Sequence, residues 1–313
     1  MASGDRLKIG VSQCLLGEQV RYDGGHKANS YVLDLLRPHF ELIPVCPEVE
    51  SGMGVPREPV ELVSDDGTLR MVGASSGVDK TEQVSEYAIR KVEELSEAGL
   101  CGYIFKARSP SCGLEVKAEG SDAPVKGLFA EAVMKAIPGI PVIEEEHLAG
   151  GEAREGWVER VFAFSRQMQF IGKPRSLGQL TMANVQAKLQ IEAHASGSFE
   201  ELFGLIQQNK GESWEGLTRP YVVRFMEILE TPITPARHFE TMKQVFDAIK
   251  PELEPNVTKE LARLLQDYRQ GNLPLGVPLM LLRHYVRISE HPMLNGQTYL
   301  EPGPRELVLR TRV

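Results

Sequence analysis

Three short apolar runs, each followed closely by a cysteine, constrain the fold of this chain more than any other feature. The runs and their cysteines are residues 7–13 with Cys14, residues 40–45 with Cys46, and residues 102–107 with Cys112. Helical patterns separate these runs, and strands that alternate with helices form a parallel sheet. Ligands bind such sheets at the carboxyl ends of the strands. The sequence therefore predicts three thiols at one edge of a sheet.

The fold class follows from the same alternation, which continues through residues 1–168. A long amphipathic helix is expected at 79–98 and a fourth apolar run lies at 140–143. Residues 50–59 contain too many Gly and Pro residues for regular structure. These patterns predict an α/β domain of three layers built on a parallel sheet.

The second part of the chain, residues 169–313, shows no alternation of period two. It predicts an all-helical domain, with the first helix expected after the segment that begins at Gly172. The expected helices are 177–195, 197–209, 219–229, 234–250, 256–270 and 277–288.

The charges are divided unevenly between the two parts. The whole chain has a net charge of −8, and residues 1–168 hold 27 acidic against 18 basic side chains. Residues 169–313 hold 16 acidic against 17 basic side chains, so a local basic surface is compatible with this half. The basic side chains expected to form it are Arg219, Arg224, Arg237, Lys243, Arg263, Arg269, Arg283 and Arg287.

Composition also indicates the cellular compartment in which the protein is expected. No run approaches the ~20 apolar residues of a membrane span, and there is no apolar signal segment. The chain has four cysteines in 313 residues. We therefore expect a cytoplasmic protein with reduced thiols and no membrane partner.

Three thiols from separate strands point to a metal site. They are compatible with zinc that keeps one position for water. They are equally compatible with a [4Fe–4S] cluster in which one iron has no protein ligand. Cys101 begins the third run and is expected at the opposite edge of the sheet, as a small buried apolar residue.

Polar residues beside the cysteines supply candidates for catalysis. Glu48 follows Cys46 by two residues and could act as a general acid or base. Its alternative role is that of an ordinary solvated carboxylate. Ser109 and Ser111 flank Pro110 just before Cys112. Each hydroxyl could face the site, Ser109 for catalysis and Ser111 to bind a substrate, or could cap a turn.

Further residues near the same edge are candidates for binding a substrate. Asp23 and Gly24 lie in a loop whose backbone could approach an anion. The cations Arg57, Lys106 and Arg108 could hold a phosphate or a carbonyl oxygen. The alternative for each is an ordinary surface position.

At these residues the chain resembles the thiouracil desulfidase family, over about residues 6–165. The motifs that carry the resemblance are Val11-Ser12-Gln13-Cys14-Leu15-Leu16-Gly17, Val20-Arg21-Tyr22-Asp23-Gly24, Val45-Cys46-Pro47-Glu48, Val55-Pro56-Arg57 and Ser109-Pro110-Ser111-Cys112-Gly113. The second half resembles a helical domain of unknown function that is often fused to the first. Its motifs include Leu273-Pro274-Leu275 and the segment Pro278–Tyr285. The two-domain arrangement is similar to that of bacterial desulfidases that act on 4-thiouridine in transfer RNA.

The resemblance implies a [4Fe–4S] cluster on Cys14, Cys46 and Cys112, with one iron left open. It implies that Glu48 and a serine, placed at Ser109, assist catalysis. The implied reaction converts 4-thiouridine in tRNA to uridine by non-redox hydrolytic removal of sulfur as hydrosulfide. One departure is that the helical domain is expected to carry a His-x-x-His-Lys element, where this chain reads Asn184-Val185-Gln186-Ala187-Lys188-Leu189.

Three rival interpretations remain at the level of sequence. The same chemistry could act on free thiouracil or thiouridine monophosphate. The chain could be a non-enzymatic iron–sulfur sensor that uses its helices to bind a partner. It could also be a zinc hydrolase. The sequence leaves the oligomeric state open.

Overall fold

The computed structural model describes residues 6–65, 67–171, 175–208 and 213–304. The chain divides into two units, Met1–Trp157 and Val158–Val313. The division falls inside helix α3 (Gly151–Met168), N-terminal to the boundary that the sequence placed after residue 168. Gly172, expected near the start of the helical part, lies outside the described residues.

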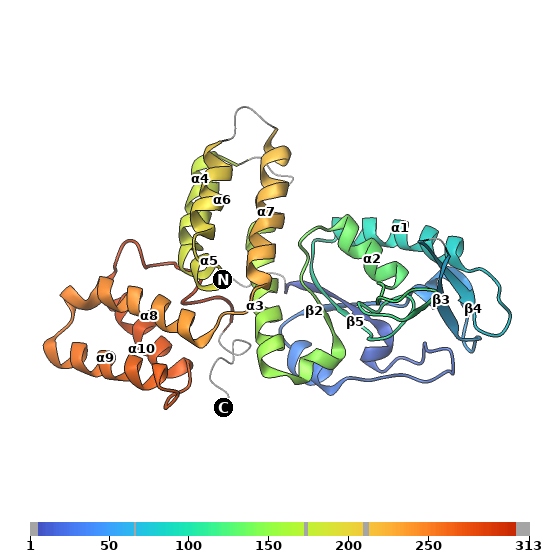
Figure 1. The fold of residues 1–313 in the computed structure, drawn as a ribbon, viewed down its shortest axis with the longest axis horizontal. Helices are drawn as coiled ribbons and strands as arrows, with labels where there is room; N and C mark the ends of the chain where they lie inside the picture. Colours follow the sequence, from blue (N-terminus) through green and yellow to red (C-terminus); the bar gives the residue numbers. More distant parts are fainter. Residues whose placement is uncertain (1–5, 66, 172–174, 209–212, 305–313) are drawn as a thin grey trace. The chain divides into compact units, whose positions relative to one another are not determined.

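A four-stranded parallel sheet organises the first unit, in the strand order β2-β1-β5-β7 (Figure 1). All six residues of β5 are buried, as expected of a strand covered on both faces. In the register of β1 and β2, Ser12 lies opposite Val45, so these two strands end side by side. The strands are β1 (Lys8–Ser12), β2 (Glu41–Val45), β5 (Leu100–Phe105) and β7 (Val142–Glu144). The predicted parallel-sheet α/β fold of the N-terminal part is confirmed.

Two helices, α1 (Thr81–Glu97) and α2 (Leu128–Ala136), pack together against this sheet (Figure 1). Aromatic rings join the three elements. The Phe129 ring on α2 lies 5.9 Å from the Tyr103 ring on β5 and 6.2 Å from the Tyr87 ring on α1, measured between centroids. These contacts fix α2, which begins just beyond the loop that carries Cys112.

A second sheet of three strands was not expected from the sequence. β3 (Val60–Asp65) and β4 (Thr68–Gly73) form an antiparallel hairpin, and β6 (Ala118–Glu119) pairs parallel with β3. Leu62 and Met71 are buried in a small core that also contains Val84 of α1. A short helical turn at Val49–Met53 likewise occupies part of the segment predicted to lack regular structure.

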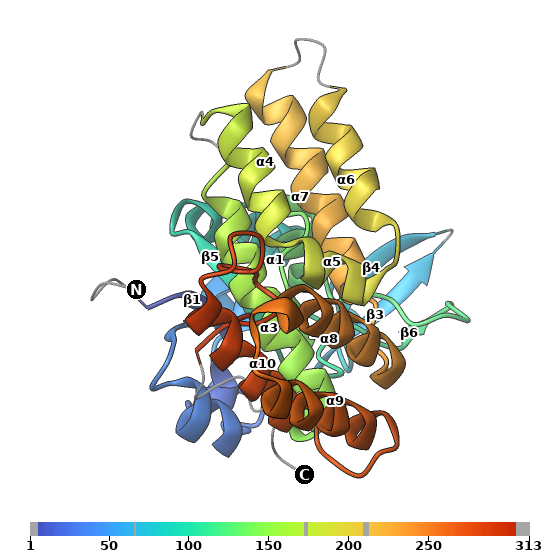
Figure 2. The ribbon, with the colours of Figure 1, turned by 90° about the vertical axis from the view of Figure 1, so that its left-hand side faces the viewer.

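The regular structure in the described residues of the second unit is entirely helical, as predicted. Its helices are α4 (Leu177–Gln186), α5 (Lys188–His194), α6 (Ser198–Gln207), α7 (Trp214–Glu230), α8 (Pro235–Ile249), α9 (Pro255–Arg269) and α10 (Gly276–Ser289). The Thr234 hydroxyl accepts from the Arg237 N–H, and Pro235 occupies the first turn, so α8 begins where its sequence signals predicted. Figure 2 shows α8, α9 and α10 grouped together, and these helices share one core with α5.

Two helices of this unit differ from the expectation. The stretch predicted at 177–195 is divided into α4 and α5 at Ala187. Helix α7 begins at Trp214, five residues before the predicted start, and contains Pro220. Within the described residues, no helix combines the length and the apolar character needed to cross a lipid bilayer.

Candidate active site

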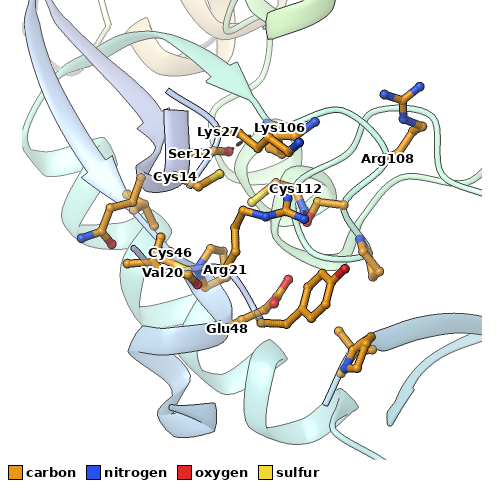
Figure 3. Close-up of a pocket in the computed structure, with 18 of the residues that line it drawn as sticks. Ser12, Cys14, Val20, Arg21, Lys27, Cys46, Glu48, Lys106, Arg108 and Cys112 are labelled. Carbon is orange, nitrogen blue, oxygen red and sulfur yellow. Dashed lines mark hydrogen bonds between the residues drawn. The ribbon is translucent and has the colours of Figure 1, made fainter. Parts of the chain in front are cut away.

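A cavity of about 430 Å³ opens at the carboxyl ends of β1, β2 and β5 (Figure 3). Its wall includes Ser12 and Val45, the last residues of β1 and β2, residues of the loops that follow the three strands, and Val60 at the start of β3. This edge is where parallel sheets bind ligands, because the connecting loops diverge there. The position predicted from the strand pattern therefore holds a cavity of the first unit.

Three cysteines line this cavity, one from each strand end. Cys14 lies two residues after the end of β1, and Cys46 directly follows β2. Cys112 comes from the loop after β5, and Figure 3 shows the sulfur atoms of Cys14 and Cys112 directed into the same space. Cys101, by contrast, is the second residue of β5, is buried, and donates to the Gly99 carbonyl at 3.4 Å. The four thiols are free.

Burial disfavours the ionised form of each of the three thiols. It raises the pKa of Cys14 to about 11, and a negative charge on Cys46 acts in the same direction. Burial also raises the pKa of Cys46 and of Cys112, and a hydrogen bond from Ser12 partly opposes this for Cys112. Three thiolates in this cavity therefore require a positively charged partner to offset their desolvation and mutual repulsion.

The thiols fit a cluster better than a single ion. No group of three or more His, Cys, Asp and Glu side chains among the described residues is arranged to hold one metal ion. A single zinc would draw three sulfur atoms to about 2.3 Å from one point. An iron–sulfur cluster is held at its corners by cysteine thiolates, and three cysteines line this one cavity. The three thiols are thus a donor set that fits an iron–sulfur cluster.

Glu48 lines the same cavity and is tightly held. The Ser111 hydroxyl donates to its Oε1 atom at 2.9 Å, and Arg57 Nε donates to its Oε2 atom at 3.0 Å. A second N–H of Arg57, on Nη2, donates to the same Oε2. The side chains are 15% and 7% exposed for Glu48 and Arg57 respectively, so this ion pair is shielded from water. The solvated-carboxylate alternative for Glu48 does not describe this residue.

The two serines of the Cys112 loop have different environments. Ser109 lines the cavity, and its Oγ accepts from the backbone N–H of Cys112 at 3.2 Å. Within the described residues, the Ser109 hydroxyl donates to no protein group, so its proton can be offered to a bound molecule. Ser111 is fully buried and uses its proton on Glu48. The role of catalytic serine, which the sequence assigned to Ser109, stays a prediction.

The candidate substrate-binding residues divide into two groups. Arg57, Lys106 and Arg108 line the cavity. Asp23 and Gly24 are not part of its wall; they form a turn in which Asp23 accepts from the Gly25 N–H at 2.9 Å.

The turn at Asp23 and Gly24 orients cavity residues that precede it in the chain. Asp23 pairs with Arg21 at 3.5 Å, and Arg21 lies 5.3 Å from the centre of the Tyr22 ring. Arg21 and Tyr22 both line the cavity. The turn thus contributes to the site through its neighbours.

Cations outnumber carboxylates among the residues that line the cavity. Arg21, Lys27, Lys106 and Arg108 all line it. Lys106 is paired with Glu145 at 2.5 Å, whereas Arg108 is 74% exposed and pairs with Glu146 at the surface. Figure 3 shows the Arg108 guanidinium directed away from the cysteines. A negatively charged group on a bound molecule would therefore meet several cations near the mouth.

Ser12 and Glu145 are among the site residues that the sequence prediction did not name. Ser12 is the buried last residue of β1, and its hydroxyl accepts from the Lys106 N–H at 2.9 Å. Glu145 accepts from the Ala107 N–H at 2.6 Å and also pairs with Lys106. Ser12 could have been found from its place at a strand end, two residues before Cys14. Glu145 lies far along the chain, and only the fold brings it to this loop.

The cations expected on the helical part are largely engaged with other protein groups. Arg237 donates to the His194 carbonyl, and the Arg269 guanidinium lies 5.0 Å from the centre of the Phe239 ring. Four others form ion pairs with carboxylates. These pairs are Arg219 with Glu215, Arg224 with Glu201 and Glu227, Lys243 with Asp247, and Arg283 with Glu301. A basic surface for RNA in this unit stays a prediction.

Comparison with known proteins gives matches to both parts of the chain. The profile of a family described as 2-thiouracil desulfurase matches residues 9–146, which include all three cavity cysteines and Glu48. A second profile, described as a protein of unknown function (DUF1722), matches residues 188–304. The two parts thus match separate families.

Individual proteins give the same picture. The uncharacterized protein YbbK of Bacillus subtilis (strain 168) is 33% identical over 146 residues, which are 44% of this chain and 95% of YbbK. The uncharacterized protein YbgA of Escherichia coli (strain K12) is 26% identical over 152 residues, which are 48% of this chain and 90% of YbgA. A solved structure of a [4Fe-4S]-dependent thiouracil desulfidase, TudS, is 32% identical and covers 46% of this chain and 94% of its own, with a TM-score of 0.40.

Proposed function

The chain belongs to the 2-thiouracil desulfurase family through residues 9–146, and from this premise we propose that it is an iron–sulfur-dependent desulfidase of 4-thiouridine in tRNA. The reaction replaces the sulfur of the thiocarbonyl group by the oxygen of water and gives uridine and hydrosulfide. The observation that carries the proposal is the cavity in which three thiols from adjacent strand ends face a shielded carboxylate, Glu48.

Cys14, Cys46 and Cys112 are the residues that would hold a [4Fe–4S] cluster, with one iron left without a protein ligand. When bound, such a cluster supplies a Lewis acid with an affinity for soft sulfur. The thiols are the only soft donors that line the described cavity, which supports this assignment.

The remaining chemistry is assigned to oxygen donors and acceptors of the chain. Glu48 is placed as the base that takes a proton from water as the oxygen attacks C4 of the ring. Ser109, whose hydroxyl proton is not used within the described residues, is placed as a donor to the same region. A C–O bond forms and the C–S bond breaks with no change in oxidation state, so no electron donor is required.

The charges of the cavity support a substrate that carries phosphate. Arg21, Lys27 and Arg108 line the cavity and offer positive charge to a phosphate group, which free thiouracil lacks. A thiouridine nucleotide, either free or within tRNA, places an anion beside the ring. Free thiouracil and thiouridine monophosphate are the alternative substrates.

The second unit is proposed as an accessory domain that holds RNA. Its exposed ion pairs, such as Lys243 with Asp247, contribute little to stability. Replacing the carboxylate by an RNA phosphate would therefore cost little free energy. We place the protein in the reducing cytoplasm because its four cysteines are free.

The test is anaerobic reconstitution with iron and sulfide, followed by incubation with thiolated tRNA, thiouridine monophosphate or 4-thiouracil. Release of sulfide together with loss of the thiouridine absorption band is the expected result for tRNA. Sulfide release from the small molecules alone would support the alternative substrates. A reconstituted protein that turns over none of the three would contradict the proposal and leave the sensor interpretation.

A further inference from the structure

We infer that Ser111 and Arg57 are positioning residues, which hold Glu48 so that a single acceptor site, on its Oε1 atom, remains for a molecule in the cavity. The inference rests on the proposed function and assigns the two residues a role other than the substrate contact expected from the sequence. Three observations carry it: the saturation of Arg57, the geometry of the Glu48 carboxylate and the burial of Ser111.

Arg57 has no N–H group left for a substrate. Its Nη1 atom donates to the Val20 carbonyl at 3.1 Å and to the Gly54 carbonyl at 2.9 Å. Its Nη2 atom donates to the Val20 carbonyl at 3.1 Å and to Glu48, and Nε also donates to Glu48. A guanidinium carries five N–H groups, and these five contacts use them all. Arg57 thus joins Glu48 to two loops of the cavity wall.

The Glu48 carboxylate is nearly saturated as well. Its two oxygens offer about four lone-pair positions. Both bonds from Arg57 end on Oε2, and the Ser111 hydroxyl takes one position on Oε1. The remaining position therefore belongs to Oε1, and this oxygen is the one left to accept from water or from a ring N–H in the cavity.

The backbone of Ser111 is held in place by the start of α2, and its side chain is not exposed to the cavity. Ser111 is fully buried, and its carbonyl accepts from the N–H groups of Phe129 and Ala130 at 2.9 and 3.2 Å. These residues form the first turn of α2, so the start of a helix sets the position of the Ser111 backbone. The hydroxyl then has a defined direction, toward Glu48.

The test compares Ser111→Ala and Arg57→Met in two backgrounds, the wild-type chain and Glu48→Ala. In the wild-type background each variant is expected to lower kcat about tenfold, the order of effect of a hydrogen bond to a charged group, with iron content retained. In the Glu48→Ala background the same changes are expected to lower kcat less than about twofold, because residues that act through one group are not additive. Arg70→Met, a change at a surface arginine paired with Asp65, is the matched control.

An equal loss in both backgrounds, or a loss confined to KM as for a substrate contact, would overturn the inference. Crystal structures of Ser111→Ala and Arg57→Met give a readout independent of turnover. The Glu48 carboxylate is expected to move or to occupy more than one position in each, and an unmoved carboxylate would overturn the positioning role even in an inactive protein. If Arg57→Met fails to fold, Ser111→Ala decides alone. A wild-type chain that releases no sulfide rejects the proposed function, while the crystal structures still test the positioning.

Discussion

At the scale of single residues, the four cysteines have the same side chain but lie at different ends of their strands. Cys101 is near the beginning of β5, where its thiol is buried and bonded to a backbone carbonyl. Cys14 and Cys46 follow the ends of their strands and line the cavity with Cys112. Position in the strand, rather than residue type, therefore separates the candidate ligands from the cysteine that packs in the core.

Replacing any one of Cys14, Cys46 and Cys112 by Ala is expected to abolish the visible absorption of the reconstituted protein and to lower its bound iron, because a corner of the proposed cluster loses its thiolate. The measurement is iron and acid-labile sulfide per chain. Cys101→Ala is the matched control and should retain both. Normal iron content in all three cavity variants would reject the ligand assignment.

Replacing Glu48 by Gln keeps the size of the side chain and removes its ability to accept a proton. The expected result is a fall in kcat of roughly 10²–10⁴-fold, the usual contribution of a general base. Iron content and the absorption spectrum should match those of the wild-type chain. A variant with the kcat of the wild type would remove Glu48 from the reaction.

Much of the candidate site was predictable because its residues lie next to one another in sequence and close to strand ends. The three cysteines, Glu48 and Ser109 were named in this way, and all line the cavity. What the sequence did not indicate were partners from distant segments, such as Glu145 at Lys106. It also did not distinguish a cation that faces the cavity from Arg57, whose N–H groups all contact protein acceptors.

At the scale of elements, the fold of the first unit follows from runs that are apolar enough to be buried on both faces. The hairpin of β3 and β4 was missed because its strands are mixed in polarity and only Leu62 and Met71 enter a core. Its turn does carry a signal, since Asp followed by Gly67 is typical of a two-residue hairpin connection, and Gly67 has a φ of 80°. Turn residues would have been a better guide here than apolar periodicity.

The loop that carries Cys112 depends on a close approach to the first turn of α2. A Cβ atom added at Gly127 would lie 2.6 Å from the carbonyl carbon of Ser111 and 2.9 Å from the backbone nitrogen of Cys112. Gly127→Ala is therefore expected to displace this loop, to lower the free energy of unfolding by about 1–3 kcal/mol and to reduce bound iron. Urea denaturation and iron analysis measure the two effects.

Gly156→Ala is the control for this change, because a Cβ at Gly156 meets nothing within 4 Å and the residue lies inside α3. It should leave stability unchanged or raise it by up to about 1 kcal/mol, since Ala is the better helix former. If Gly127→Ala behaves in the same way as this control, the loop does not depend on the close approach.

At the scale of the whole molecule, the two units differ in charge as well as in fold. Residues 1–168 are acidic and residues 169–313 are close to neutral, yet cations gather around the cavity of the acidic part. Net charge therefore describes the surface at a distance, whereas the side chains at the mouth decide which substrates are attracted. Helix α3 is continuous across the division at residue 157 and offers no break in the sequence pattern there.

Ionic strength should separate the candidate substrates. If tRNA makes about three phosphate contacts, a plot of log KM against the logarithm of the salt concentration should have a slope of about 2 or more. For 4-thiouracil, which is neutral, KM should change little over the same range. The measurement is initial-rate kinetics of the full chain between about 50 and 200 mM salt. A KM for tRNA that does not respond to salt would argue that phosphate contacts have no part in recognition.

The carbonyl of Val20 joins a cavity cysteine to the arginine that holds Glu48. It accepts from the Cys46 thiol at 3.8 Å and also from two N–H groups of Arg57. A thiol that gives up its proton to bind iron withdraws one of these donors, and the guanidinium keeps the loop in place. Loss of the Cys46 proton thus leaves the Val20 carbonyl with both of its guanidinium donors, and the anchorage of this backbone segment does not depend on the thiol.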